Sequence, residues 1–134
     1  MLVTASANKV FLWENVPDER TFVLSDVVSV HTPETTLTWV EDHHRVYSGN
    51  SLGKLTLWRI VFRADAGNKS DHDAKEGGTK QFRLIKAAHI NAHTGIVSAI
   101  RNIASLDVVA TASLDGRLCI WDTAGKFLLV LNLV

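Results

Sequence analysis

Short apolar runs recur along the chain and alternate residue by residue with polar positions, as strands with one buried face do. Asn, Asp, Gly and Ser separate these runs at intervals of roughly 8 to 12 residues, which is typical of all-β proteins. No long segment carries the 3.6-residue period of an amphipathic helix. The pattern therefore predicts an all-β chain with eleven strands, at residues 2–7, 10–14, 21–25, 36–40, 45–50, 55–62, 82–87, 97–103, 108–113, 118–122 and 127–131.

Three segments repeat one longer pattern, in which a small, hydroxyl-rich strand is followed by a turn and by an apolar strand that ends in Trp. The segments are VTASANKVFLWEN (3–15), VYSGNSLGKLTLWRI (46–60) and VATASLDGRLCIWDT (109–123). A His-Thr pair precedes the second copy at His31 and the third copy at His93. Residues 63–81, which are polar and contain almost no apolar side chains, lengthen the interval between these two copies. We interpret them as an inserted loop.

The third copy, ATASLDGRLCIWD preceded by His93-Thr94-Gly95, resembles a WD repeat. That family forms β-propellers from four-stranded blades, with repeats of about 40–45 residues and a His…Trp-Asp signature. The resemblance covers nearly the whole chain apart from residues 63–81. The first two copies are degenerate, because they end in Trp-Glu and Trp-Arg.

The resemblance implies an all-β WD-repeat propeller segment made of four-stranded antiparallel blades. Residues 1–30 would form a first blade without its inner strand, residues 31–87 a second blade with the loop insertion 63–81, and residues 88–134 a third blade. Propellers typically have four to eight blades, so this chain alone would not close one. We therefore expect a fragment of a larger propeller, or a chain whose propeller is completed by further blades from the same or another chain.

In such blades a histidine, a strand hydroxyl, a turn aspartate and a tryptophan form a structural hydrogen-bond network. The third copy supplies His93, Thr111 or Ser113, Asp115 and Trp121. The second copy supplies His31, Ser48 and Trp58, but Leu52 takes the place of the turn aspartate, so its network should be incomplete. The first copy keeps Trp13 together with Thr4 and Ser6.

A hydroxyl, a histidine and an aspartate also make up a hydrolytic triad, so a hydrolase using Ser113, His93 and Asp115 is the alternative hypothesis. A triad needs an exposed nucleophile beside an oxyanion hole. A strand hydroxyl packed under a tryptophan would not be exposed, and we therefore predict that the chain is not an enzyme.

Charge and composition narrow the function further. The 134-residue chain has 14 Lys and Arg against 14 Asp and Glu, so no net positive field gathers nucleic acid or an anionic membrane. No apolar run approaches the roughly 18–20 residues of a membrane span, and the single cysteine excludes an internal disulfide. His89 and His93 have a zinc-binding spacing only if they lie on a helix, which we do not expect. The sequence predicts a cytoplasmic protein with no metal and no cofactor.

The resemblance implies a scaffold for protein–protein interaction whose partners are other proteins, with a cytoskeletal or ciliary role as one possibility. On the family's geometry, the second-to-third-strand turns share one face with the loops before the inner strands, here 25–35 and 88–96. The predicted partner contacts on that face are Lys9, Glu34, Asn91 and Arg117, with Trp39 near the central channel as a further candidate.

Overall fold

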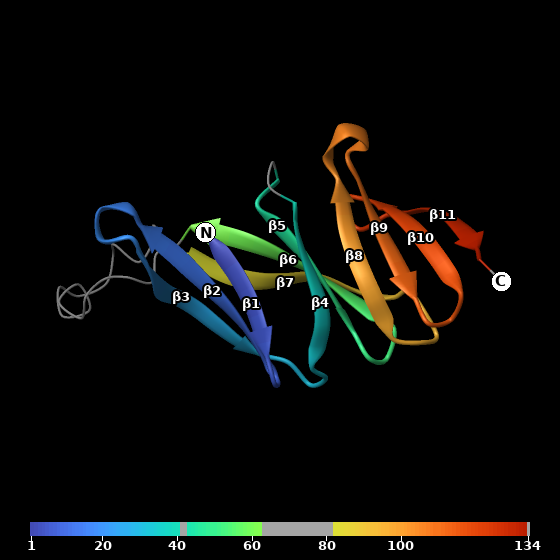
Figure 1. Ribbon diagram of the computed structural model, residues 1–134, viewed down its shortest axis with the longest axis horizontal. Helices are drawn as coiled ribbons and strands as arrows, with labels where there is room; N and C mark the ends of the chain where they lie inside the picture. The colour runs from blue at the N-terminus through green and yellow to red at the C-terminus, as the bar shows by residue number, and fades with distance from the viewer. Residues whose placement is uncertain (41–42, 63–81, 134) are drawn as a thin grey trace.

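The computed structural model describes residues 1–40, 43–62 and 82–133, and the predicted insertion 63–81 lies outside these residues. The described residues form an all-β fold of antiparallel strands (Figure 1). The strands are β1 (Leu2–Ser6), β2 (Lys9–Val16), β3 (Thr21–Ser29), β4 (Glu34–Val40), β5 (Arg45–Asn50), β6 (Lys54–Phe62), β7 (Phe82–Asn91), β8 (Val97–Ile103), β9 (Val108–Ser113), β10 (Arg117–Asp122) and β11 (Phe127–Asn132). Two 3-10 turns, η1 (Pro17–Glu19) and η4 (Ala104–Leu106), connect strands. No helix in this described part is long and apolar enough to cross a membrane.

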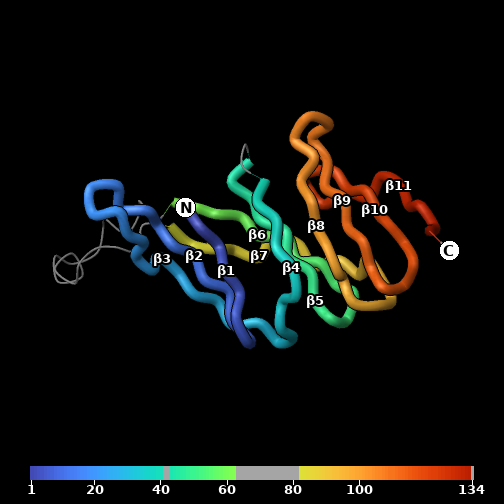
Figure 2. The backbone as a smooth tube through the Cα atoms, viewed as in Figure 1, coloured from blue at the N-terminus to red at the C-terminus, as the bar shows by residue number. Residues whose placement is uncertain are grey.

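The strands form three separate sheets, none of which closes on itself. Sheet 1 has the order β1-β2-β3, sheet 2 the order β4-β5-β6-β7, and sheet 3 the order β8-β9-β10-β11. The sheets follow one another along the long axis of the molecule in chain order, from the blue N-terminal sheet to the red C-terminal sheet (Figure 2). Each sheet is therefore a local meander, because every pair of hydrogen-bonded neighbours is consecutive in sequence.

Glycine shapes two of the three hairpins that carry the repeated segments. Gly53 in the β5–β6 turn and Gly116 in the β9–β10 turn have φ angles of 80° and 82°, a region that glycine enters without steric cost. The β1–β2 turn is shorter and has no glycine, and Ala7 takes a φ of 50° there. Gly53 also passes so close to the backbone carbonyl of His93 that a Cβ atom would collide with it.

A β-bulge recurs beside the tryptophan of each sheet. The pairing of the tryptophan strand with the strand that follows it shifts register between Leu12 and Trp13, between Leu57 and Trp58, and between Ile120 and Trp121. A bulge adds one residue to one strand and increases the local twist. Since the same irregularity occurs at the same place three times, the three sheets share one strand geometry.

Two apolar cores hold the three sheets together. The first lies between sheets 1 and 2 and contains Val10, Leu12 and Trp58; the second lies between sheets 2 and 3 and contains Leu55, Leu57 and Trp121. We call the side of a sheet that faces the preceding sheet its upstream face, and the opposite side its downstream face. In sheets 2 and 3 the tryptophan occupies the upstream face.

Sheets 2 and 3 are in close contact where Gly49 faces Val97. A Cβ atom on Gly49 would lie 2.6 Å from Cγ1 of Val97, so this position admits no larger residue without movement of the backbone. The Thr35 hydroxyl lies beside the same contact, 2.8 Å from the carbonyl oxygen of Val97.

The outer strands of sheets 1 and 2 are longer than the sequence predicts. β3 continues to Ser29, β4 begins at Glu34 and β7 continues to Asn91, so most of the predicted loop 25–35 and the first part of the predicted loop 88–96 are strand. The extra residues of β7 pair with the start of β6, with Asn91 opposite Lys54 and His89 opposite Thr56. This segment contains Ile90, which favours strands, among Ala, His and Asn, which do not, and pairing with β6 continues the strand through all of them.

Candidate functional site

The tryptophan of each repeated segment donates a hydrogen bond to a hydroxyl on the preceding strand. The indole nitrogen of Trp13 lies 2.9 Å from Thr4 Oγ1, that of Trp58 lies 2.8 Å from Ser48 Oγ, and that of Trp121 lies 3.0 Å from Thr111 Oγ1. An indole N–H can only donate, and a buried one needs an acceptor. Each hairpin therefore contains the same hydrogen bond from an indole to a hydroxyl, which we call its tie.

The strand register explains why the same bond forms three times. The residues directly opposite the tryptophans are Leu2, Val46 and Val109. In each hairpin the hydroxyl residue follows that partner by two positions, so it lies on the same face and diagonally across from the indole. A one-residue change of register would move the hydroxyl to the other face and remove the bond.

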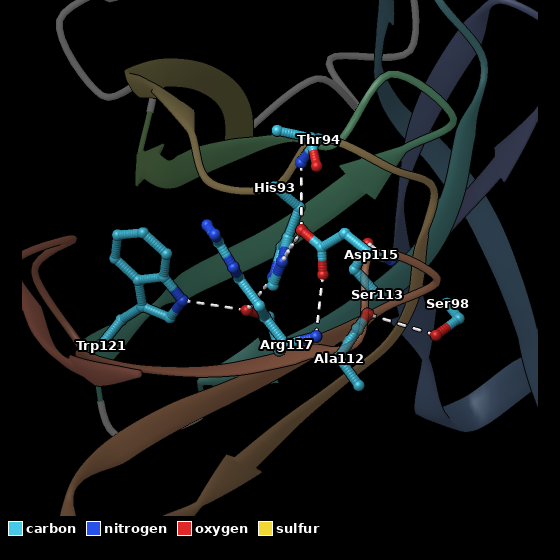
Figure 3. A network of polar contacts seen from close by, with 9 residues as sticks. His93, Thr94, Ser98, Ala112, Ser113, Asp115, Arg117 and Trp121 are labelled. Atoms are coloured by element: carbon cyan, nitrogen blue, oxygen red, sulfur yellow. Dashed lines mark hydrogen bonds and ion pairs between the residues drawn. The ribbon is translucent and has the colours of Figure 1, made fainter. Parts of the chain in front are cut away.

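In sheet 3 this tie continues into a buried network of four side chains (Figure 3). His93 Nε2 lies 2.9 Å from Thr111 Oγ1, and His93 Nδ1 lies 3.0 Å from Asp115 Oδ2. Asp115 also accepts the backbone N–H groups of Thr94 and Arg117. The network joins the β7–β8 loop to the β9–β10 turn and to the strand that carries Trp121.

The chemistry of Asp115 sets the direction of the hydrogen bonds. Burial raises the pKa of Asp115, but the N–H groups of Thr94 and Arg117 and the His93 ring outweigh it, so that its pKa lies below the usual value of 3.8. An ionised carboxylate only accepts, so Nδ1 of His93 donates, and in the neutral ring Nε2 accepts. The Thr111 hydroxyl then donates to Nε2 while accepting from Trp121, and the bonds run in one direction from Trp121 to Asp115.

In sheet 2 the structure differs from the predicted network. His31 is exposed in the connection between β3 and β4 and takes no part in the bond between Trp58 and Ser48. Leu52 takes the position that Asp115 holds in the β9–β10 turn, so this turn has no carboxylate to accept a hydrogen bond from the His31 ring. The assignment of His31 to a network with Ser48 and Trp58 is therefore wrong.

Glu34, at the start of β4, lies beside Ser48 of this bond in sheet 2. Burial raises the pKa of Glu34 above its usual value, and the hydroxyl of Ser48 and the charge of Lys86 lower it to a smaller extent. Within the described residues, the Oε2 atom of Glu34 is buried without a hydrogen-bond partner. A buried carboxyl without full pairing favours its neutral form, and the partner contact expected at Glu34 stays a prediction.

Ser113 does not take the place of Thr111. Both nitrogens of the His93 ring are engaged by Asp115 and Thr111, while the Ser113 hydroxyl accepts the backbone N–H of Asp115 at 3.1 Å. Ser113 therefore stabilises the turn. The arrangement lacks the serine–histidine bond with which a triad begins.

The remaining predicted partner residues come from all three sheets. Lys9 begins β2 and Arg117 begins β10, and both are exposed. Asn91 is exposed at the end of β7 rather than in a loop. Trp39, on β4, is half-buried and packs against the core between sheets 1 and 2, so it contributes to packing.

Several polar contacts between sheets could not be found from the sequence. Tyr47 donates from its hydroxyl to the carbonyl of Asp122 at 2.8 Å, and Arg45 donates to the carbonyl of Thr123 at 2.9 Å. Burial and the Asp122 charge together raise the pKa of Tyr47 well above 10.0. No sequence motif marks these pairs, because the partners are backbone carbonyls far along the chain.

The outer strands of sheets 1 and 2 are joined in a similar way. Ser25 exchanges hydrogen bonds with the backbone N–H and C=O of Phe82, and Asp26 accepts the N–H of Leu84 at 2.9 Å. Ser25 is the extra residue of the bulge in β3, since Leu12 pairs with Asp26 and Trp13 with Leu24. The bulge thus directs two polar side chains at the free edge of β7, which would otherwise expose unpaired backbone groups.

Comparison of the sequence with protein-family models and with curated proteins finds no match.

Proposed function

We propose that this chain is a segment of a WD-repeat-type β-propeller and acts as a non-enzymatic scaffold for protein–protein interaction. The observation that carries the proposal is the threefold repetition of one hairpin: a tryptophan bonded to a hydroxyl diagonally across the strands, with a bulge beside it. The repetition of the unit in three stacked sheets supports a blade-like role for each.

The end sheets support a ring that continues in both directions. Leu12 and Leu57 hold equivalent positions before the tryptophan and are buried by the following sheet, whereas Ile120 in sheet 3 is only half-buried. At the other end Trp58 and Trp121 are 0% and 4% exposed under the preceding sheet, whereas Trp13 is half-buried. The uncovered faces are thus the same surfaces that pack against each other inside the molecule.

Both uncovered faces are apolar over several strands. On the downstream face of sheet 3, Leu129 and Leu131 pair with Ile120 and Leu118 and are exposed. Contiguous apolar surface of this kind marks an interaction site. We infer that further blades, from the same or another chain, cover these faces.

The scaffold role is supported by what the buried polar groups do. His93, Thr111 and Asp115 satisfy one another and the indole of Trp121, and they fix the relative positions of a loop, a turn and two strands. Such a network makes the exposed loops rigid, which lowers the entropic cost of binding a partner. We propose that the chain acts in a cytoplasmic protein assembly. A cytoskeletal or ciliary assembly is one form of this proposal.

Light scattering on the purified chain tests the proposal. We expect species larger than the 14.8 kDa chain, because the open faces should pair with those of other copies or with added blades. Leu129→Glu, on the open face, should reduce the association, while Leu106→Glu, on an exposed 3-10 turn, is the matched control. A monodisperse 14.8 kDa species from the unsubstituted chain would contradict the proposal.

A further inference from the structure

Three basic residues occupy the same position in the three sheets. Lys9, Lys54 and Arg117 are the first residues of β2, β6 and β10, and each precedes the tryptophan of its sheet by the same number of residues. Lys9 and Arg117 are exposed, and Lys54 is half-exposed. Since the hairpins share one geometry, these side chains start from equivalent points on the three sheets.

All three residues lie at one edge of the molecule. The β1–β2, β5–β6 and β9–β10 turns all lie along the lower edge of the view in Figure 1. We call this edge the hairpin rim and define it by residues 7–9, 51–54, 92–96 and 114–117. Leu52 and Leu114 are 59% and 74% exposed in two of its turns, and Ile96 is exposed between them.

Backbone hydrogen bonds tie part of the rim into one surface. The N–H of His93 donates to the carbonyl of Gly53 at 2.9 Å, and the N–H of Leu114 donates to the carbonyl of Ile96 at 3.1 Å. These bonds link the turn of sheet 2 to the loop 92–96, and the same loop to the turn of sheet 3. The positions of Lys54 and Arg117 are fixed relative to each other through these bonds.

Within the described residues, none of the three cations has an ion-pair partner. The ion pairs found there join His43 to Asp107 and His93 to Asp115. Asp115 is the acid of the rim, and its carboxylate is occupied by His93 and by two backbone N–H groups. The exposed His89, which pairs with the start of β6, has a pKa lowered mainly by burial and to a smaller extent by the charges of Lys86 and Lys54.

We propose that the hairpin rim binds an acidic peptide segment of a partner protein that also carries apolar side chains. The inference rests on the proposed scaffold function and names the class of its partner. Carboxylates would meet Lys9, Lys54 and Arg117, while apolar side chains would cover Leu52 and Leu114. Charge complementarity of this kind selects partners and speeds their encounter.

The spacing of the sheets suggests the spacing of the acids. Packed sheets lie about 10 Å apart, and an extended chain advances about 3.3 Å per residue. Neighbouring cations of the rim are thus separated by about three residues or more of extended peptide. Exposed leucines between the cations favour a peptide over a nucleic acid, because a single strand needs aromatic side chains on which its bases stack.

Fluorescence anisotropy with a labelled synthetic peptide tests this inference. The peptide carries glutamate at every third position and leucine at positions between the glutamates. A charge-reversed peptide, with lysine in place of each glutamate, is the negative probe. The variant K9Q/K54Q/R117Q should weaken binding about tenfold at low salt, if each exposed contact contributes a few tenths of a kcal/mol. The matched variant R59Q/R83Q/R101Q removes three exposed cations away from the rim and should change binding less than twofold.

The outcomes separate this inference from the proposed function. Selective weakening by the rim variant, which also diminishes as salt rises, supports it. Equal weakening by both triple variants, no binding of the acidic peptide, or tighter rim-dependent binding of a single-stranded RNA of equal charge overturns it. Light scattering on the same samples reports the association of the open faces; if association persists while peptide binding is absent, only the rim inference fails.

Discussion

Replacing Thr111 with valine removes a hydroxyl that two buried groups share, while keeping the size and branching of the side chain. Trp121 and His93 are 4% and 7% exposed, so water cannot readily replace the lost partner. The variant leaves the N–H of Trp121 without an acceptor and Nε2 of His93 without a donor. An unsatisfied buried polar group costs about 1–3 kcal/mol, and the two together should lower the free energy of unfolding by about 2–5 kcal/mol.

Two further variants turn this estimate into a graded series. Ser48→Ala removes the acceptor of one fully buried indole, that of Trp58, and should cost about 1–3 kcal/mol. Thr4→Val removes the acceptor of Trp13, which is half-buried and can bond to water, so the cost should stay below about 1 kcal/mol. The expected order of destabilisation is Thr111→Val, then Ser48→Ala, then Thr4→Val.

Urea denaturation followed by circular dichroism measures the series at a fixed protein concentration, because association also stabilises the fold. At an m-value of about 2 kcal/mol/M, the Thr111→Val midpoint should fall by about 1–2.5 M without a change in slope. A midpoint for Thr111→Val equal to or above that of Thr4→Val would refute the reasoning that burial decides the cost of the lost hydroxyl.

Three other substitutions test separate parts of the structure. The pKa of Asp115 is lowered in the fold, so its stabilisation is present above pH 3.8 and is lost as the pH falls through the folded value; Asp115→Asn should destabilise near pH 6 and match the parent protein in strong acid. The pKa of Glu34 is raised, so its ionised form destabilises the fold above pH 4.5; Glu34→Gln should raise the melting temperature at pH 7 and leave it unchanged near pH 4. Gly49→Ala places a Cβ 2.6 Å from Val97 and should cost about 1–3 kcal/mol in urea titration, whereas Ser51→Ala in an exposed turn should cost nothing measurable.

The strand positions could be predicted because they depend on neighbouring residues. Alternating apolar positions and turn residues locate β5 (Arg45–Asn50), β8 (Val97–Ile103) and β9 (Val108–Ser113) at the predicted bounds. The ends of β3 and β7 were not predicted, because polar residues such as Asp26, Ser29 and Asn91 resemble a loop sequence. Val27, Val28 and Ile90 among them favour strands, and pairing with the preceding strand carries the polar residues along.

The same division applies to the site residues. The repeated pattern marks Thr111, Ser48 and the tryptophans, because hydroxyl and indole lie in one hairpin and their separation in sequence fixes their separation in space. His31 and His93 have the same local context, a His-Thr pair before an inner strand, but the ring needs a carboxylate in a turn of the following hairpin. Asp115 supplies that carboxylate and Leu52 does not, so His93 is buried and His31 is exposed.

The sequence by itself determined the all-β class, the three hairpins and the tie within each, since alternation, turns and diagonal neighbours all act over a few residues. Only the tertiary structure decided which groups meet between sheets: Tyr47 with the carbonyl of Asp122, and Asp26 with the edge of β7. It also decided that Glu34 lies partly buried near Ser48 and that Lys54 joins Lys9 and Arg117 on one rim. The physical reason is that stacked sheets bring together residues from distant parts of the chain, and local sequence patterns carry no information about which ones will face each other.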